Sequence, residues 1–311
     1  MCKATLIMTV EEMKDRNAWL ATRNMGLGGS DAAIVVGLSK WKSPFQLWME
    51  KTGQAEPEDL SENECVYWGT VLEQAVADRF CELTGKKVQR RGLMQSVEHP
   101  FMLASVDRMV VGENAGLECK TANGFAAKQW TDDEVPNAYY CQCQHYMAVT
   151  GCERWYIACL IGGNHFVWKV IERNEADIKA LIEAEEKFWA RVTTKTMPEV
   201  DAAAVPALAE KFRGGLKEPV ELGEDAAKMA EEYMTLGDRI KALERAQETC
   251  KAKLMELMED NEVGNAGGWK INWAVRKGRT TFDSKRFQAE HAELYKQYTK
   301  QGKDYRMFSV K

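Results

Sequence analysis

Residues 102–121 read MLASVDRMVVGENAGLECKT, and this stretch decides how the chain is understood. Two runs rich in apolar residues, 102–111 and 116–121, flank the polar turn at 112–114, so they predict two neighbouring strands. Asp107 would lie at the end of the first strand. Glu118 and Lys120 would share one face of the second strand, because side chains two residues apart along a strand point the same way.

Two carboxylates and a lysine on adjacent strands suit phosphodiester hydrolysis. Asp107 and Glu118 supply the oxygen ligands that a hard divalent cation such as Mg²⁺ prefers. Lys120 would position a water bound to that cation and help to deprotonate it. The alternative is structural, with Asp107 as a turn acid and Glu118–Lys120 as an exposed ion pair, since an acid followed by Glu-X-Lys often arises by chance.

Residues outside this stretch add to the same hypothesis. Glu73 lies in a helix predicted over 65–83 and is a candidate third carboxylate for the cation, although most helix acids are simply solvated. Gln142 and Tyr146 lie four residues apart on one face of a helix that Pro136 opens and Gly151 ends. Buried polar groups on that face would need partners, which a bound water or a phosphate would supply.

Hydrophobic periodicity and turn signals predict a mixed α/β domain over the first 200 residues. A capping box at Thr9–Glu12 opens the first helix, and a Gly-Gly-Asn turn at 162–164 joins the last two strands. The predicted helices cover 9–23, 30–36, 44–53, 65–83, 136–149 and 178–192, and the predicted strands cover 87–93, 102–111, 116–121, 155–161 and 165–171.

Composition predicts a division of the chain into a domain over 1–200, a linker over 201–222 and a C-terminal extension over 223–311. The linker contains Pro206, Pro219 and the pair Gly214-Gly215. The extension begins with a long helix whose apolar residues recur at steps of four and three from Met229 to Leu257, which suits either an intermolecular coiled coil or packing on its own domain. A strand from residue 269, a helix capped by Asp283 and a closing strand over 305–310 are expected to follow.

Charge is distributed unevenly along the chain. The net charge is −5, yet residues 269–311 contain eleven Lys and Arg against four Asp and Glu, a local charge of +7 that leaves −12 for the rest. This basic tail is either an ordinary solvated segment or a nucleic-acid contact. We expect Arg276, Lys277 and Arg279 to bind DNA phosphates, with docking of a partner protein or completion of an oligomer as the alternative roles of the tail.

Composition excludes several classes of protein. With 45% hydrophobic and 29% charged residues the chain can bury a core, and no apolar stretch approaches the ~20 residues of a membrane span. Nine scattered cysteines suit a reducing cytoplasm. We therefore expect a cytoplasmic protein with no signal peptide, and neither a membrane protein, a secreted disulfide scaffold nor a fibrous protein.

Three other chemistries are not expected. Cys141, Cys143 and His145 have alternate spacing on a predicted helix, so their side chains point away from one another and cannot share a zinc ion. The cysteines at 141, 143, 152 and 159 lack the close C-terminal spacing of the iron–sulfur clusters found in some nucleases. No G-x-x-x-x-G-K-[ST] loop for ATP is present.

Six motifs in order extend the comparison beyond single residues. They are GGSDAA at 28–33, KWKSPFQLWMEKTG at 40–53, WGTVLE at 68–73, ASVDRMV at 104–110, LECKTA at 117–122 and YYCQCQHYMAVTG at 139–151. Over roughly residues 15–175 the chain resembles the YqaJ-like viral recombinase family, the relatives of phage lambda exonuclease. This resemblance implies a restriction-endonuclease-like core, in which helices flank a mixed central sheet.

The resemblance also implies a role for each matching residue of the core. Asp107 and Glu118 correspond to the metal-ligating carboxylates, with the backbone carbonyl of Cys119 as a further ligand. Lys120 corresponds to the lysine that activates water. Glu73 corresponds to the family's helical glutamate, expected to act in catalysis and metal binding, and Gln142 to its glutamine. The gap between Asp107 and Glu118 differs by one residue from the lambda enzyme, which a longer turn at 112–114 would absorb.

A pocket for a terminal 5′-phosphate is implied in the same way. Arg23 and Ser30 stand at the family's spacing of an arginine and a serine, and Ser105 matches another serine of the pocket. Lys40 stands where the lambda enzyme has an arginine, and a lysine lacks the planar fork for bidentate phosphate binding. The alternative for Ser30 is that it only caps its helix.

The resemblance implies a Mg²⁺-dependent 5′→3′ double-strand DNA exonuclease of phage or prophage recombination, with Mn²⁺ as an expected substitute. It would act on 5′-phosphorylated ends, leave a 3′ strand for a single-strand annealing protein and assemble as a ring-shaped trimer in the bacterial host. Two alternatives remain open. One is an endonuclease or structure-specific nuclease of the same superfamily, and the other is a non-catalytic DNA-binding recombination factor.

Overall fold

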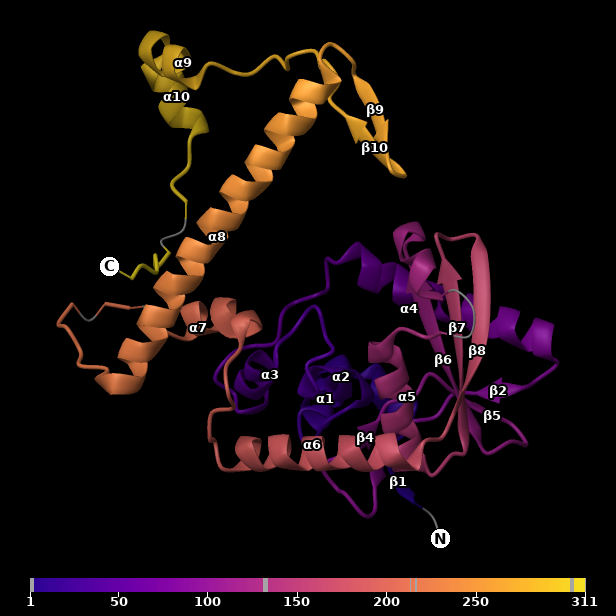
Figure 1. The fold of residues 1–311 in the computed structure, drawn as a ribbon. Helices are drawn as coiled ribbons and strands as arrows, with labels where there is room; N and C mark the ends of the chain where they lie inside the picture. The colour runs from indigo at the N-terminus through magenta and orange to yellow at the C-terminus, as the bar shows by residue number, and fades with distance from the viewer. Residues whose placement is uncertain (1–2, 131–133, 213, 216, 303–304, 311) are drawn as a thin grey trace. The chain divides into compact units, whose positions relative to one another are not determined.

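The computed structural model describes residues 3–130, 134–212, 214–215, 217–302 and 305–310 (Figure 1). The chain divides into two compact units, residues 1–212 and residues 213–311. The first unit contains all the residues of the predicted nuclease core.

A five-stranded mixed sheet forms the centre of the first unit. Its strand order is β2 (Val88–Gln89), β5 (Arg108–Val110), β6 (Ala115–Ala122), β7 (Arg154–Ile161) and β8 (His165–Glu172). Neighbours run antiparallel except β6 and β7, which are parallel because helix α5 (Asn137–Thr150) connects them. The predicted hairpin at 162–164 is confirmed, and its first two residues are glycines at φ 61° and 77°, values that favour glycine.

Helices cover both faces of this sheet (Figure 1). Side chains of β7 alternate, so Trp155 and Ile157 pack in one cluster with α5 while Tyr156 and Ala158 pack in another with α4 (Glu64–Thr84). Leu117 of β6 belongs to the α4 cluster. Its neighbour Glu118 therefore faces α5, because successive side chains of a strand point to opposite faces.

A second layer of helices packs around α5. It consists of α2 (Gly29–Val35), α3 (Pro44–Lys51) and α6 (Glu175–Thr193), and a cluster around Phe45, Trp48 and Phe188 fills the space between α3 and α6. A small three-stranded sheet lies beside these helices, in the order β1 (Ala4–Met8), β3 (Leu93–Ser96) and β4 (Leu103–Ala104). The sequence patterns did not predict β1.

Several helix ends form where the sequence predicts them. Helix α4 begins after the N-cap Asn63, and α4 and α5 end at Gly85 and Gly151, which adopt φ of 69° and 75°. The capping box of Thr9 and Glu12 is present, but it closes only a 3-10 turn over Glu12–Lys14. The prediction of one helix over 9–23 is therefore wrong, because a separate helix α1 (Arg16–Arg23) starts after its own N-cap, Asp15.

Two predicted strands are each divided between the two sheets. The stretch 87–93 splits into β2 and β3, and 102–111 splits into β4 and β5. The break in the second stretch falls on Ser105, Val106 and Asp107. Asp107 therefore stands immediately before β5, where the backbone is free of regular strand pairing.

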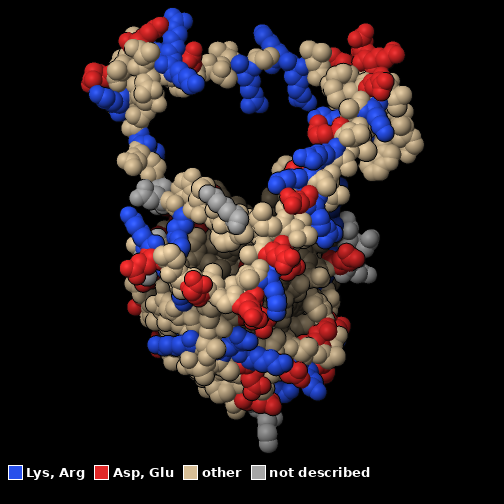
Figure 2. All heavy atoms as spheres, turned by 60° about the vertical axis from the view of Figure 1, so that its left-hand side comes forward, with Lys and Arg blue, Asp and Glu red and all other residues tan. Residues whose placement is uncertain are grey.

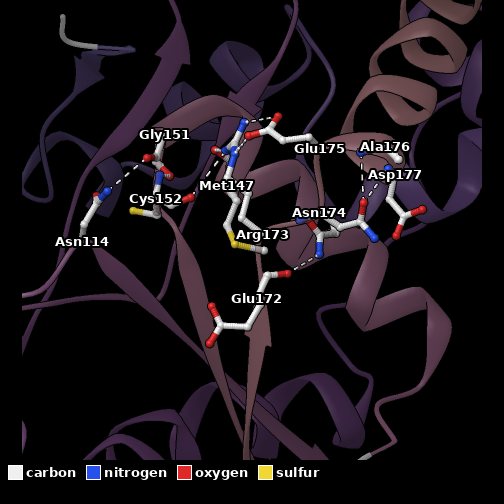
Figure 3. A network of polar contacts seen from close by, with 12 residues as sticks. Asn114, Met147, Gly151, Cys152, Glu172, Arg173, Asn174, Glu175, Ala176 and Asp177 are labelled. Atoms are coloured by element: carbon white, nitrogen blue, oxygen red, sulfur yellow. Dashed lines mark hydrogen bonds and ion pairs between the residues drawn. The ribbon is translucent and has the colours of Figure 1, made fainter.

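The C-terminal end of α5 is held in place by Arg173, which follows β8 (Figure 3). Its guanidinium donates to the backbone carbonyl of Met147 at 2.5 Å and pairs with Glu175. Nearby, Asn174 caps α6 by accepting from the amides of Ala176 and Asp177. The contact of Arg173 with Met147 therefore ties α5, the helix that carries Gln142, to the end of β8.

Part of the predicted linker packs with the first unit. Within 201–222, residues Ala202–Ala204 form a 3-10 turn and Val205–Lys211 form helix α7, and Ala204 and Ala207 join the cluster around Phe45. The division between the two units accordingly falls at residue 212.

The second unit consists of a long helix and smaller elements. Helix α8 (Gly223–Met258) precedes a hairpin of β9 (Val263–Ala266) and β10 (Trp269–Asn272), and Asp283 caps α9 (Ser284–Glu290), which α10 (Ala292–Tyr298) follows. The expected strand over 305–310 does not form. Instead the ring of Phe308 contacts Tyr233 of the apolar seam on α8, with ring centroids 5.5 Å apart.

Candidate active site

Asp107 joins the two strands on which the predicted site is built. Its Oδ2 accepts a hydrogen bond from the backbone amide of Cys119 at 2.7 Å. This bond links the break before β5 to the middle of β6, so it brings Asp107 beside Glu118. The alternative of Asp107 as an isolated turn acid does not describe this arrangement.

Glu118 lies at the centre of a connected polar group. Its Oε1 accepts from Lys120 Nζ at 2.6 Å and from Gln142 Nε2 at 2.8 Å, while Gln142 Oε1 accepts from Lys120 at 3.0 Å. Gln142 also donates to the hydroxyl of Tyr146 at 3.0 Å, and that hydroxyl donates to the carbonyl of Ser105 at 2.9 Å. Glu118 and Lys120 are therefore not an exposed pair.

The second oxygen of Glu118 has no such partner. Glu118 is 3% exposed, and among the described residues nothing donates a hydrogen bond to its Oε2. A buried carboxylate oxygen without a donor is costly, and a cation is one way of satisfying it.

Burial and repulsion between carboxylates raise the pKa of Asp107 well above its ordinary value. Burial is the larger cause and the charge of Glu118 the next, while Lys120 and the Cys119 amide act in the opposite direction. For Lys120, burial would lower the pKa, but the charges of Glu118 and Asp107 outweigh burial and raise it. The acidic pair thus carries more negative charge than its surroundings readily accommodate, a state that a divalent cation relieves.

Glu73 is placed differently from the other two acids. Its Oε1 accepts from Arg108 at 2.5 Å, and Arg108 also donates to the carbonyl of Asp107 at 2.7 Å and to Gln74 Oε1 at 3.0 Å. Glu73 is close enough to contribute to the raised pKa of Asp107. Its carboxylate is nevertheless bound to an arginine rather than joined to the other acids.

The residues present fit a divalent cation of the hard type. Oxygen ligands are available from Asp107 and Glu118, including the unpartnered Oε2, and Glu73 lies nearby. In the part of the chain that the structure describes, no three His, Cys, Asp or Glu side chains are grouped to hold an ion by themselves. Two carboxylates, backbone oxygen and solvent are the ligands that these residues offer.

The structure brings Arg23 and Ser30, two residues of the expected phosphate pocket, into contact. A nitrogen of the Arg23 guanidinium donates to Ser30 Oγ, and Arg23 also lies over the ring of Trp19 at 5.3 Å. Ser30 is exposed and does not cap α2, whose N-cap is Gly28. The alternative for Ser30 as a helix cap is therefore wrong, and its hydroxyl faces Arg23 instead.

Asp31 and Lys51 form a buried ion pair next to the segment that joins Arg23 to Ser30, and Lys51 donates to the carbonyl of Gly26 at 2.7 Å. Their side chains pair at 3.1 Å and are almost wholly buried, and Asp31 accepts from the amide of Gly28 at 3.0 Å. Burial alone would raise the pKa of Asp31, but the charges of Lys51 and Arg23 outweigh it and lower the pKa. The pair therefore holds the turn that leads from Arg23 to Ser30.

The other predicted DNA-binding residues are divided between the two units of the chain. Ser105 is half-buried and its carbonyl accepts from Tyr146, which ties it to the active-site group. Lys40 is exposed in the loop between α2 and α3. In the second unit, Arg276, Lys277 and Arg279 are exposed in the irregular segment between β10 and α9, from which basic side chains project (Figure 2).

Reasoning from the sequence missed two residues of the site. Arg108 follows Asp107 directly and lies in the predicted strand over 102–111, and only the structure shows that its charge is buried beside Glu73. Gly29 enters the sequence analysis only within the GGSDAA motif, yet a Cβ at this position would lie 2.6 Å from Tyr146 Cε1 and 3.0 Å from Gln142 Cγ. Only glycine lets α2 approach α5 this closely.

Comparisons with known proteins place this site in a family. A profile of the YqaJ-like viral recombinase domain matches residues 18–153. The uncharacterized protein YqaJ of Bacillus subtilis (strain 168) is 37% identical over 317 residues, which covers 99% of this chain and 98% of that protein. The chain belongs to the YqaJ-like viral recombinase family. The resemblance drawn from the six motifs is thereby confirmed.

Other similar proteins are more distant from this YqaJ-like chain. Protein D345L of African swine fever virus (isolate Tick/Malawi/Lil 20-1/1983) is 38% identical over 71 residues, 22% of this chain and 20% of that protein. The crystal structure of an alkaline exonuclease (LHK-Exo) from Laribacter hongkongensis is 22% identical, with a TM-score of 0.49 over 58% of this chain and 93% of that one. A phage-related exonuclease from Haemophilus somnus 129PT is 14% identical, with a TM-score of 0.43 over 55% and 96% of the two chains.

Family membership agrees with the architecture of the first unit. The expected α/β fold class is confirmed, since a mixed central sheet lies between helices. Membership of this family supports a nuclease enzyme. Among the described residues, no helix has the length and apolar character needed to cross a membrane.

Proposed function

We propose that this YqaJ-like protein is a Mg²⁺-dependent 5′→3′ exonuclease for double-stranded DNA, with Mn²⁺ as a substitute ion. The observation that carries the proposal is the buried Glu118 carboxylate, which has one oxygen bound to Lys120 and Gln142 and the other without a donor among the described residues. Asp107 lies beside it through the bond to the Cys119 amide. Acids and a lysine in this arrangement suit hydrolysis of a phosphodiester.

Asp107, Glu118 and the backbone carbonyl of Cys119 would hold the cation in this proposal, with Glu73 nearby. When bound, a divalent cation supplies positive charge that stabilises the negative charge developing on the phosphate oxygens. The carboxylates and the buried surroundings make that charge effective, because electrostatic interactions strengthen where water is excluded.

The remaining polar side chains would handle the attacking water. Lys120 Nζ is held between Glu118 Oε1 and Gln142 Oε1 and lies 4.8 Å from the centre of the Tyr139 ring, so its position is restricted on three sides. From there its ammonium group would donate a hydrogen bond that orients the water, and its positive charge would favour loss of a proton from that water. Gln142 keeps Lys120 in place and is itself held by Tyr146. Restriction of this kind places reacting groups without further reorganisation.

Recognition of the DNA end would fall to the Arg23–Ser30 pair. We propose that these two side chains bind the terminal 5′-phosphate, together with Ser105 and the point charge of Lys40. A phosphate accepts strong charge-assisted hydrogen bonds from an arginine, and the Ser30 hydroxyl lies within reach of the same guanidinium. The buried ion pair of Asp31 and Lys51 next to this segment would keep the shape of the pocket constant.

The cellular setting of the proposal follows the family. The protein would be encoded by a phage or prophage and act in the host cytoplasm, leaving a 3′ strand for a single-strand annealing protein. We propose a ring-shaped trimer as the assembly. The exposed Arg276, Lys277 and Arg279 of the second unit would contact DNA phosphates.

The experiment that tests this function uses linear duplexes labelled at either end. Purified protein with Mg²⁺ should release label progressively from 5′-phosphorylated ends and leave a covalently closed circle intact. Asp107→Asn should abolish release of label, and it should also abolish the rise in Tm that Mg²⁺ gives the wild type. Cleavage of the closed circle would favour an endonuclease, and the absence of any hydrolysis would favour a DNA-binding factor.

A further inference from the structure

Arg108 is a charged side chain at the active site whose presence the proposed chemistry does not require. Its side chain is 3% exposed, and it reaches three acceptors: Glu73 Oε1, the carbonyl of Asp107 and Gln74 Oε1. An arginine cannot lose its charge in a protein, so a permanent positive charge stands beside the acids that are to hold a cation. The position of this positive charge beside the proposed cation ligands therefore calls for an explanation.

Glu73 would be a natural third ligand if Arg108 were absent. Its charge reaches Asp107, since it contributes to the raised pKa of that residue. Its side chain is 28% exposed, against 4% for Glu118, which leaves Glu73 more freedom to move than Glu118 has. Three carboxylates on one cation would bind it more tightly than two, because ligand charge sets affinity.

Recruiting Glu73 to a cation would leave Arg108 without its charged partner. The exposed Arg90 approaches Glu73 Oε1 only to 4.0 Å, so it does not replace Arg108 as the closest cation. A buried guanidinium without a carboxylate is strongly unfavourable. The pair therefore opposes any movement of Glu73 toward the cation.

We infer that Arg108, by pairing with Glu73, prevents this carboxylate from becoming a ligand of the cation. The pairing thereby lowers the affinity of the Asp107–Glu118 pair for divalent ions. Arg108 is a positioning residue in this role, because it acts through Glu73 and the Asp107 backbone. The inference rests on the proposed metal site.

The test is a binding isotherm of the full chain with Mn²⁺ alone, measured by calorimetry in the absence of DNA. Arg108→Met should raise the affinity at least about tenfold, the lower end of the effects of groups that surround metal ligands. Arg108→Lys keeps the charge and should remain within about threefold of the wild type. Arg79→Met is the matched control, because Arg79 lies exposed on the same helix as Glu73 and pairs only with its neighbour Glu82 in the described contacts, so this change should leave the isotherm unaltered.

A second variant keeps the inference testable if Arg108→Met does not fold. Glu73→Gln retains an acceptor for Arg108 and should change Mn²⁺ affinity by less than about twofold. A tenfold loss in Glu73→Gln would show that Glu73 is already a ligand and would overturn the inference. So would an unchanged isotherm in Arg108→Met, or a gain that persists in the double variant Arg108→Met/Glu73→Gln, where no carboxylate is left to recruit.

The failure of the inference and the failure of the proposed function give different results. A wild-type protein that binds Mn²⁺, and loses this binding in Asp107→Asn, supports the proposed site whatever Arg108→Met does. A wild-type protein that binds no Mn²⁺ overturns both. In an activity assay, Arg108→Met should lower the Mg²⁺ concentration for half-maximal rate at least about tenfold while kcat does not rise.

Discussion

Lys120 of β6 donates a hydrogen bond to Gln142 of α5 at 3.0 Å, and both side chains bind the same oxygen of Glu118. Helix α5 is the connection between the parallel strands β6 and β7, so the element that crosses the sheet also completes the site on it. Tyr146, one turn further along α5, ties this group to the Ser105 carbonyl beside Asp107. The acid, the lysine and the glutamine thus form one connected unit.

Loss of Lys120 should remove activity without removing the fold. Lys120→Met is expected to lower the turnover of Mg²⁺-dependent hydrolysis by about 10²–10⁴-fold, the usual contribution of a group that orients or deprotonates the attacking water. The side chain is similar in length, so the circular dichroism spectrum should not change. Lys179→Met, an exposed lysine on α6, is the control and should retain full turnover. A Lys120→Met enzyme with near wild-type turnover would refute the assignment.

Substitution of Gly29 should affect both stability and activity. In Gly29→Ala the new Cβ would lie 2.6 Å from a ring atom of Tyr146, which is buried and bonded to Gln142 and so cannot readily move. We expect a loss of about 1–3 kcal/mol in the free energy of unfolding and a reduced kcat. Urea denaturation measures the first effect. As a control, Gly69→Ala meets only Thr121 Oγ1 at 3.7 Å within a helix and should not destabilise the protein.

Stability should depend on pH through the buried pair of His145 and Glu185. Both ring nitrogens of His145 face acceptors, Glu185 Oε1 at 2.8 Å and the Leu103 carbonyl at 2.9 Å, so only the protonated ring satisfies both. Burial would lower the pKa of His145, but the charge of Glu185 and the bonds to both partners outweigh burial and raise it. The stability this gives is complete below the unfolded pKa of about 6.5 and is lost as pH rises through the higher folded value.

The variant His145→Gln isolates this effect. The difference in Tm between the wild type and His145→Gln should be largest near pH 6 and should narrow toward alkaline pH. His165→Gln, which changes an exposed histidine at the start of β8, should show no such dependence. A difference that widens with rising pH would contradict the charged state assigned to His145.

The proposed 5′-phosphate pocket at Arg23 and Ser30 predicts that the protein prefers DNA with phosphorylated 5′ ends. Arg23→Ala should slow digestion of 5′-phosphorylated ends much more than digestion of 5′-hydroxyl ends, because only the phosphate makes use of the guanidinium. Single-turnover rates on matched duplexes measure the ratio. An equal loss on both substrates would leave Arg23 with a structural role beside Trp19 and Ser30.

The basic segment of the second unit predicts a salt dependence. Replacing Arg276, Lys277 and Arg279 together with Gln should lower the slope of log affinity against log salt by roughly two to three units, since each phosphate contact adds about 0.9. Processivity should fall while cleavage of a bound end is retained. An unchanged slope with loss of a protein partner, or a smaller assembly, would instead assign this segment to docking or oligomerisation.

Local signals in the sequence determined the elements and the chemical types of the site. Gly85 and Gly151 marked the ends of α4 and α5 because a positive φ suits glycine, and the spacing of Glu118 and Lys120 placed both on one face of a strand. Motif order was sufficient to recognise the family. These features depend on neighbours within a few residues, which is why they could be predicted from the chain alone.

Tertiary structure decided which of these groups meet and in what state. The break at 105–107 assigns β4 and β5 to different sheets, and pairing between distant strands, which no local pattern records, sets that division. The ion pair of Glu73 and Arg108 joins helix α4 to strand β5, and its two residues lie 35 positions apart in the sequence. Burial then removes water from Glu118 and leaves one of its oxygens without a donor among the described residues, so the feature on which the proposed cation site rests arises only when the sheet and α5 pack together.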